Sequence, residues 1–341
     1  MNSLPFQYNI SLKPYNTFGI EVFAKIFIEI KSIDNLIQLV DSQKFIANKK
    51  LILGGGSNVL LTQDFEGIVV KNSLLGIEIL KQDSDFVWIK SGAGVAWHSF
   101  VRYCVDHNYA GVENLSLIPG TVGAAPMQNI GAYGVEIKDV FESLEAITIL
   151  DGSLQIFNKE NCNFGYRESV FKNIFKNQFI IISVTFRLNK TPKFNTSYGA
   201  ITEVLNKNGI KELSIKAISD AVIEIRSSKL PDPKVLGNSG SFFKNPEVSL
   251  QKVEELKLIY PNIPNYPINE SSVKLAAGWL IEQCGWKGKI VGNTGSHKDQ
   301  ALVLVNYGDA SGIEIWQLAQ DIKLSVWNKF NVEIVAEVNV I

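Results

Sequence analysis

Residues 114–135 are the most constraining segment of the sequence, because they include four glycines and two prolines but no charged residue. A segment interrupted so often by proline and glycine is no membrane-spanning helix. We expect loops whose main chain comes close to other groups, since only glycine permits such an approach. The glycines are Gly120, Gly123, Gly131 and Gly134, and the prolines are Pro119 and Pro126.

Two shorter glycine-rich loops each follow an apolar run, and they read Gly54-Gly55-Gly56-Ser57-Asn58 and Gly92-Ala93-Gly94. Neither completes the dinucleotide fingerprint G-x-G-x-x-G, and no phosphate-binding P-loop motif occurs. The loops are either ordinary turns or nests of backbone N–H groups that bind the phosphates of a large cofactor. The residues alone leave both readings open.

Charge and composition limit the partners. Lys plus Arg number 33 and Asp plus Glu number 34, so no basic field exists to bind nucleic acid. No apolar stretch is long enough to span a membrane, and the N-terminus lacks the features of a signal peptide, so we expect a cytoplasmic protein. The three cysteines form no CxxC pair and the three histidines no HExxH motif, so we expect neither disulfides nor a metal.

The periodicity predicts strands and helices that intermix without strict alternation, which favours an α+β fold. A capped helix from residue 33 and a strand at 51–53 suggest a βαβ-type unit within the first seventy residues, and Asp151-Gly152 centres a hairpin over 144–157. Further helices are predicted at 95–106, 215–229, 250–259, 272–284 and 312–328, and further strands at 68–71, 77–81, 86–90, 179–186 and 332–340.

Ser241 lies in the segment 230–246, which begins with a rigid Pro-Asp-Pro turn and places two phenylalanines directly after this serine. A hydroxyl held among aromatic side chains is suited to proton transfer away from water. The G-x-S-x-G motif of hydrolase nucleophiles is absent. From the residues alone, a surface loop with a hydrogen-bonded serine is the simpler interpretation.

Taken together, several motifs resemble the UDP-N-acetylenolpyruvoylglucosamine reductase family, and the likeness runs in order from about residue 16 to the end. The family implies a vanillyl-alcohol-oxidase or MurB-type FAD-binding fold with a separate C-terminal substrate-binding domain. It also implies FAD-binding parts at 1–71 and at 72–230 plus 331–341, and a substrate-binding domain at 231–330. The motifs are GGGSN at 54–58, PGTVGAAPMQNIGAYG at 119–134, GYRES at 165–169, KLPDP at 229–233, GSFFKNP at 240–246 and AEV at 336–338.

The resemblance implies that NADPH reduces a non-covalently bound FAD, which then reduces UDP-N-acetyl-3-O-(1-carboxyvinyl)-glucosamine to UDP-N-acetylmuramate for peptidoglycan synthesis. Arg167 matches the family arginine that holds the substrate carboxylate, Ser241 the proton donor, and Glu337 a glutamate near the same carbon. The chain has only four arginines, which fits a bidentate role for Arg167; without the resemblance, a surface ion pair with Glu168 is the simpler reading. We likewise expect a solvent-exposed Glu337 from its strand pattern alone.

The remaining correspondences concern binding. Tyr198 lies in an insertion that resembles the family form with a tyrosine-bearing lid, and Arg226 either serves the same phosphates as Lys229 or only packs. His98 is interpreted as a packed helix residue. The implied FAD contacts are Gly54, Gly55, Gly56, Ser57, Asn58, Pro119, Gly120, Thr121, Gly123, Ala124, Ala125 and Gly131, and the implied substrate contacts are Tyr166, Tyr198, Lys229, Asn245 and Gln300.

Two alternatives stay open. One is an oxidase of the same fold that acts on a small hydroxy acid without consuming NADPH, and the other is a UDP-sugar-binding protein without catalytic activity. We expect a monomer whose partner is a nucleotide-sugar substrate.

Overall fold

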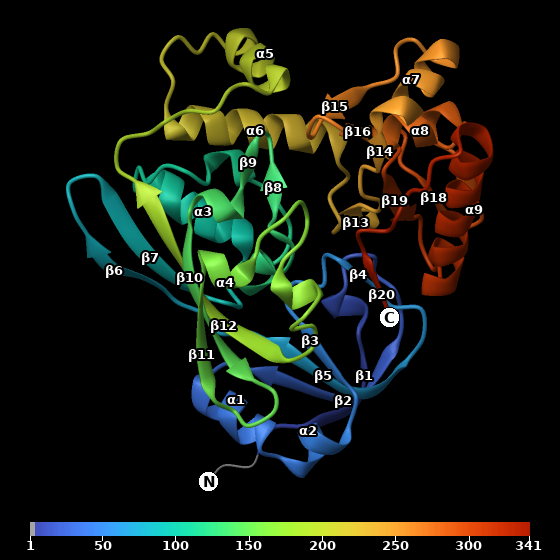
Figure 1. The fold of residues 1–341 in the computed structure, drawn as a ribbon. Coiled ribbons are helices and arrows are strands. Elements are labelled where there is room, and N and C mark those ends of the chain that lie inside the picture. The colour runs from blue at the N-terminus through green and yellow to red at the C-terminus, as the bar shows by residue number, and fades with distance from the viewer. Residues whose placement is uncertain (1–3) are drawn as a thin grey trace. The chain divides into compact units, whose positions relative to one another are not determined.

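The computed structural model describes residues 4–341, and their contacts divide them into two compact units (Figure 1). The first unit contains residues 4–10, Ala24–Gly56 and Phe65–Ser228. The second contains Ser11–Phe23, Ser57–Asp64 and Lys229–Ile341. The three-part division implied by the resemblance stays a prediction.

The first unit begins with a four-stranded sheet of strand order β1-β2-β5-β3, in which β2 and β3 both run parallel to β5. Helix α1 lies between β2 and β3 in the chain, and its N-terminus is capped by the Ser32 side chain, which accepts a hydrogen bond from the Asn35 amide. The predicted βαβ arrangement is therefore confirmed. The bounds are β1 Gln7–Ser11, β2 Phe23–Ile30, α1 Ile33–Val40, α2 Gln43–Ala47, β3 Lys50–Leu53 and β5 Phe65–Asn72.

A five-stranded antiparallel sheet of order β11-β10-β12-β7-β6 also belongs to this unit. Its central strand β12 is almost continuously buried, whereas the edge strands are largely exposed. The hairpin predicted around Asp151-Gly152 is the β10–β11 pair. The bounds are β6 Ile77–Gln82, β7 Phe86–Gly92, β10 Phe141–Thr148, β11 Leu154–Asn158 and β12 Phe179–Asn189, with α4 at Lys159–Cys162.

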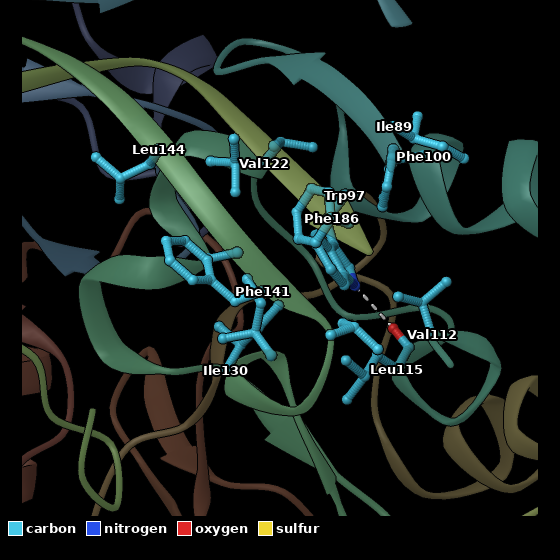
Figure 2. Close-up of a cluster of buried hydrophobic side chains, with 14 of the residues drawn as sticks. Ile89, Trp97, Phe100, Val112, Leu115, Val122, Ile130, Phe141, Leu144 and Phe186 are labelled. Atoms are coloured by element: carbon cyan, nitrogen blue, oxygen red, sulfur yellow. Dashed lines mark hydrogen bonds between the residues drawn. The ribbon is translucent and has the colours of Figure 1, made fainter. Parts of the chain in front are cut away.

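Helix α3 (Trp97–Asp106) packs into the main core of this unit. Trp97, Phe100 and Phe186 form an aromatic group with ring centroids 4.5–5.8 Å apart. The indole Nε1 of Trp97 donates to the Leu115 carbonyl at 2.9 Å, as Figure 2 shows. The uncharged segment thus contributes buried residues to the core and is held there by a hydrogen bond from a helix.

Helix α5 (Gly199–Lys207) lies along α6 (Ile215–Lys229), as Figure 1 shows. Ile201 and Leu205 of α5 pack with Ile218 and Val222 of α6. The sequence predicted α6 but only an insertion where α5 lies.

The second unit combines a four-stranded sheet, β13-β19-β18-β17, with a three-stranded sheet, β14-β16-β15. Phe18 packs edge-on against Phe242 with centroids 6.3 Å apart, so the segment Ser11–Phe23 belongs to this core. The bounds are β4 Val59–Leu60, β13 Gly237–Ser241, β14 Glu247–Ser249, α7 Leu250–Ile259, β15 Asn265–Pro267, β16 Ser272–Leu275, α8 Ala277–Gln283, β17 Ile290–Val291, β18 Thr294–Ser296, β19 Val303–Asn306, α9 Gly312–Phe330 and β20 Asn339–Val340.

Two predicted elements differ in the structure. The helix predicted over 272–284 is a strand, β16, followed by α8, because alternate burial of Val273 and Leu275 fits a sheet and Leu275 bonds to the Pro246 carbonyl. The strand predicted over 332–340 is reduced to Asn339–Val340 and an isolated bridge between Phe243 and Ala336.

Short 3₁₀ helices lie at Lys13–Tyr15, Glu113–Leu115, Val122–Ala124, Pro126–Gln128, Ile137–Asp139 and Val170–Lys172, and the small strands β8 and β9 at Gly131–Ala132 and Val135–Glu136. Within residues 4–341, no helix has both the length and the apolar character needed to cross a bilayer. Over the same residues, no group of three or more His, Cys, Asp or Glu side chains could hold a metal ion.

Candidate active site

Two of the glycine-rich loops touch each other in the first unit. A Cβ atom on Gly55 would lie 2.8 Å from the Gly120 Cα, and one on Gly54 would lie 2.6 Å from the Thr121 Oγ1. Side chains at these glycines would push the loops apart, so the close approach requires glycine. The amides of Gly54 and Gly55 donate to no acceptor among residues 4–341, which fits a cradle of N–H groups for a bound phosphate-containing cofactor.

The turn at Gly120–Gly123 is fixed by the main chain of the remaining glycine-rich loop, Gly92-Ala93-Gly94, and of the residues that follow it. The Trp97 amide donates to the Gly120 carbonyl at 3.0 Å, and the Val122 and Gly123 amides donate to the Val95 and Ala93 carbonyls, both at 2.9 Å. A Cβ on Gly123 would lie 2.5 Å from that of Ala93. The three loops that the sequence singled out therefore form one structure.

Arg167 occupies the left-handed region, with φ of 56°, in a turn closed by hydrogen bonds between the Gly165 and Glu168 main chains. Its Nη2 donates to the Gly131 carbonyl at 2.7 Å, and its guanidinium carbon lies 5.6 Å from the centroid of the Tyr166 ring. This half-buried guanidinium is therefore directed toward the glycine-rich hairpin of β8 and β9.

Asn129 connects the segments around Arg167. It is fully buried, and its Nδ2 donates to the Gly165 carbonyl at 2.9 Å and to Glu136 at 3.0 Å. The Ser169 hydroxyl donates to the Met127 carbonyl at 2.7 Å. Both ends of the Arg167 turn are therefore bonded to the uncharged segment.

Tyr198 stands at the N-cap of α5 and is 53% exposed. Its ring meets Tyr133 edge-on with centroids 5.2 Å apart. Tyr133 also interacts with Arg226, whose Nε donates to the Leu117 carbonyl at 3.2 Å. Burial lowers the pKa of Arg226 and raises that of Tyr133.

The second unit brings Ser241 and Glu337 into neighbouring chain segments. The Glu337 amide donates to the Phe242 carbonyl at 2.8 Å, and the Lys244 amide donates to the Val335 carbonyl at 2.9 Å. Glu337 is half-buried rather than exposed, which corrects the expectation from its strand pattern. Its position follows from this pairing with the segment after Ser241, which a local pattern does not reveal.

Asn58 joins the same part of the second unit. Its carbonyl accepts a hydrogen bond from the Asn339 amide at 3.1 Å, and its Nδ2 donates to the Glu337 carbonyl at 3.5 Å. The GGGSN motif is thus divided: Gly54–Gly56 belong to the first unit, and Ser57 and Asn58 to the second.

The expected substrate contacts of the second unit are built into its loops. The Asn245 Oδ1 accepts from the Ala277 amide at 3.0 Å, and the Gln300 Oε1 accepts from the Leu302 amide at 3.4 Å. Lys229 is the exposed last residue of α6. These bonds leave the amide NH₂ groups of Asn245 and Gln300 as donors suited to an anionic ligand.

Sequence reasoning did not single out Asn114, Asn129 or Tyr133 individually. Asn114 donates to the Tyr133 carbonyl at 3.1 Å and to the Asn195 carbonyl at 2.9 Å, so it ties the base of the insertion to the β8–β9 hairpin. All three belong to the uncharged segment, and their signal was an amide or phenol in a stretch otherwise poor in hydrogen-bonding side chains. Their partners are distant in the chain and could not be assigned from it.

Comparison with known proteins gives two family matches. Residues 24–158 match the model described as an FAD binding domain, and residues 232–341 match that of the UDP-N-acetylenolpyruvoylglucosamine reductase C-terminal domain. The UDP-N-acetylenolpyruvoylglucosamine reductase of Flavobacterium johnsoniae is 53% identical over 339 residues, covering 99% of this chain and 100% of the relative. That of Pseudomonas putida is 46% identical over 337 residues, covering 99% of both chains.

Solved structures show the same fold. The UDP-N-acetylenolpyruvylglucosamine reductase from Thermus caldophilus aligns with a TM-score of 0.66 at 22% identity, over 99% of this chain and 98% of the other. A solvent-stable cholesterol oxidase aligns with a TM-score of 0.51 at 12% identity, over 98% and 87%. The expected α+β, oxidase-type FAD-binding fold is confirmed.

Proposed function

The chain belongs to the UDP-N-acetylenolpyruvoylglucosamine reductase family, and from that premise we propose that Arg167, Ser241 and Glu337 carry out the chemistry of an FAD-dependent, NADPH-consuming reductase of peptidoglycan precursor synthesis. The observation that carries the assignment is the identity of 53% over nearly the whole chain. The reaction converts UDP-N-acetyl-3-O-(1-carboxyvinyl)-glucosamine to UDP-N-acetylmuramate.

FAD, when bound, would supply the two-electron chemistry that links NADPH oxidation to reduction of the carbon–carbon double bond of the enol ether. The two touching glycine loops are suited to hold it, because the amides of Gly54 and Gly55, which find no acceptor in the described part of the chain, offer donors to phosphate oxygens. The proposed contacts continue through the turn from Pro119 to Ala125 and to Gly131, and through Ser57 and Asn58.

Arg167 is proposed to bind the carboxylate of the enolpyruvyl group. A guanidinium can hold both carboxylate oxygens with parallel hydrogen bonds, and it stabilises the negative charge that builds up on the neighbouring carbon. The bond from Nη2 to the Gly131 carbonyl fixes its orientation. The aromatic ring of Tyr166 beside the guanidinium further limits its motion.

Ser241 is proposed to donate the proton that completes the reduction. A serine hydroxyl is a weak acid, so this transfer requires a strongly basic carbon and a site that excludes water. The rings of Phe242 and Phe243, which follow directly in the chain, are buried, but Ser241 itself is exposed. Substrate bound over Ser241 would therefore have to exclude water from its hydroxyl. Glu337, held beside this segment through the Phe242 carbonyl, is proposed to act near the same carbon.

The substrate diphosphate and sugar are proposed to contact Tyr166, Tyr198, Lys229, Asn245 and Gln300. Tyr198 is supported by its place at the N-cap of α5, in an insertion that resembles the tyrosine-bearing lid of the family. A cytoplasmic location is proposed because NADPH and nucleotide sugars are made there.

The decisive experiment follows NADPH oxidation by absorbance, with and without the enolpyruvyl nucleotide sugar. We expect consumption only with this substrate and formation of UDP-N-acetylmuramate. Oxygen-dependent oxidation of a hydroxy acid without NADPH would instead indicate an oxidase. Purified protein that binds the nucleotide sugar but no FAD would indicate a binding protein.

A further inference from the structure

Leu117 has an unusual main-chain conformation two residues before the proposed FAD-binding turn. Its φ is 58°, in the left-handed region, which is unfavourable for a residue with a bulky side chain. The conformation persists only where surrounding bonds fix it. Leu117 is half-buried, between α3 and α6 of the first unit.

Both polar groups of the Leu117 main chain are bonded to side chains. Its amide donates to the Nδ1 of His98 on α3 at 2.9 Å, and its carbonyl accepts from the Nε of Arg226 on α6 at 3.2 Å. The preceding Ser116 hydroxyl lies 2.9 Å from that of Ser219 on α6. Before that, the Leu115 carbonyl accepts from Trp97 (Figure 2). Three successive residues are thus fixed by two helices.

The segment 93–98, which contains His98, holds the other side of the turn. The main chain of residues 93–97 bonds to Gly120, Val122 and Gly123, and His98 follows directly. The segment 93–98 therefore bonds to the turn itself through its main chain. It also bonds to Leu117, which precedes the turn, through the imidazole of His98. His98 supplies the only side-chain acceptor that the Leu117 amide has among residues 4–341.

We propose that His98 is a positioning residue of the FAD site, because its Nδ1 fixes the left-handed Leu117 and thereby the backbone geometry of the turn at Pro119–Gly123. The inference rests on the proposed assignment of that turn to FAD. His98 acts through the main chain and needs no contact with the cofactor. Its role requires an unprotonated Nδ1, since the Leu117 amide is itself a donor.

The charges around His98 favour this neutral state. Burial and the nearby guanidinium groups of Arg102 on α3 and Arg226 on α6 lower the pKa of His98 below its usual value of 6.5. Arg102 is itself paired with Asp106 at 3.0 Å and with Asp220 at 3.5 Å. Protonation in acid would place a second donor against the Leu117 amide and release the turn. A lowered pKa in the folded state means that the contribution is complete above pH 6.5 and declines as the pH falls through the pKa of the folded state.

The test compares His98→Leu, which removes the acceptor, with His98→Asn, whose Oδ1 can take the place of Nδ1. Apoprotein is titrated with FAD, and Kd is read from flavin fluorescence between pH 5 and 8. An unsatisfied amide should raise the Kd of His98→Leu roughly tenfold or more, whereas His98→Asn should stay within about threefold of wild type at pH 7.5. Affinity should fall in acid for wild type and change less for His98→Asn.

The matched control replaces His107, the exposed histidine that caps the same helix, by Leu and by Asn. Neither change should alter the Kd for FAD or its pH dependence. Unchanged affinity in His98→Leu, or an acid dependence that persists fully in His98→Asn, would overturn the proposal. If His98→Leu does not fold, the pH profile of His98→Asn decides. A wild-type protein that binds no FAD would instead contradict the proposed function of the turn.

Discussion

At the scale of the residue, Ser241 and Glu337 show how an undistinguished serine and glutamate can become a candidate catalytic pair. They lie 96 positions apart in number, yet the bond from the Glu337 amide to the Phe242 carbonyl holds their segments together. Both side chains are proposed to act in the oxidation of the flavin by the substrate, so the two half-reactions can distinguish such chemistry from a role in shaping the flavin pocket.

The Ser241→Ala variant should slow only the half-reaction that needs a proton at carbon. A positioned general acid contributes ~10² to 10⁴ in rate, equivalent to roughly 3 to 5.5 kcal/mol. Reduction of FAD by NADPH creates no carbanion and should keep its rate. Stopped-flow absorbance measures each half-reaction, with Ser241→Cys as a variant that retains a donor. Equal slowing of both half-reactions would show that Ser241 shapes the flavin pocket instead.

The Arg167→Lys variant should also impair oxidation of the flavin by the substrate, because an ammonium cannot form two parallel bonds to a carboxylate. Loss of a charge-assisted bond of about 1.5 to 3 kcal/mol corresponds to a roughly 10- to 100-fold decrease in kcat/KM. Arg187, which lies over Phe86 on a β-strand, provides a control arginine for the same exchange. Similar losses in both variants would point to general destabilisation.

At the scale of the element, α5 and the insertion before it form a structure anchored on both sides of Tyr198. Asn114 ties Asn195 to the β8–β9 hairpin, and the apolar face of α5 packs on α6. Tyr198, between these two anchors, is exposed, and its ring meets that of Tyr133 edge-on. Such a segment can close over a bound ligand without disturbing the core.

Changes at Tyr198 should therefore affect substrate binding and leave FAD content unchanged. Removing the hydroxyl in Tyr198→Phe should raise the substrate Kd about fivefold, the value of one hydrogen bond of about 1 kcal/mol. Tyr198→Ala also removes the ring and should raise it further. Calorimetric titration of the nucleotide sugar and flavin absorbance report the two quantities. Flavin loss in either variant would indicate a structural role.

At the scale of the whole molecule, the glycine cradle should couple FAD binding to stability. A ligand at 100 times its Kd stabilises the folded state by about 2.7 kcal/mol, which shifts the Tm of a chain of this size by roughly 4 °C. Differential scanning fluorimetry of apoprotein at rising FAD concentrations tests this. A Tm that does not change with FAD would contradict the cradle.

We also expect the flavin to be bound without a covalent bond, to a monomer of 37.8 kDa. Burial raises the pKa of Cys104 well above its usual value and that of Cys162 to about 12, so neither is a reactive thiolate. Acid precipitation should leave all yellow colour in the supernatant. A yellow pellet would show covalent attachment, and light scattering reports the oligomeric state.

The sequence by itself determined the elements that depend on local pattern. The capped helix α1, the hairpin around Asp151-Gly152 and the long helices α6 and α9 follow from periodicity and turn residues. The motif resemblance led to the family and its cofactor, which the comparisons confirm. The site residues that it implies stay predictions, supported by their surroundings.

Tertiary structure decided what local pattern could not. The local pattern of 272–275 is compatible with strand or helix, and this segment became a strand because it pairs with β14 on one side and β15 on the other. Glu337 became half-buried only because its segment pairs with the one after Ser241. The left-handed Leu117 is held by His98 and Arg226, which are respectively 19 and 109 residues away. Contacts between residues so distant in the chain form only when the chain folds, and they fix the conformations on which the site depends.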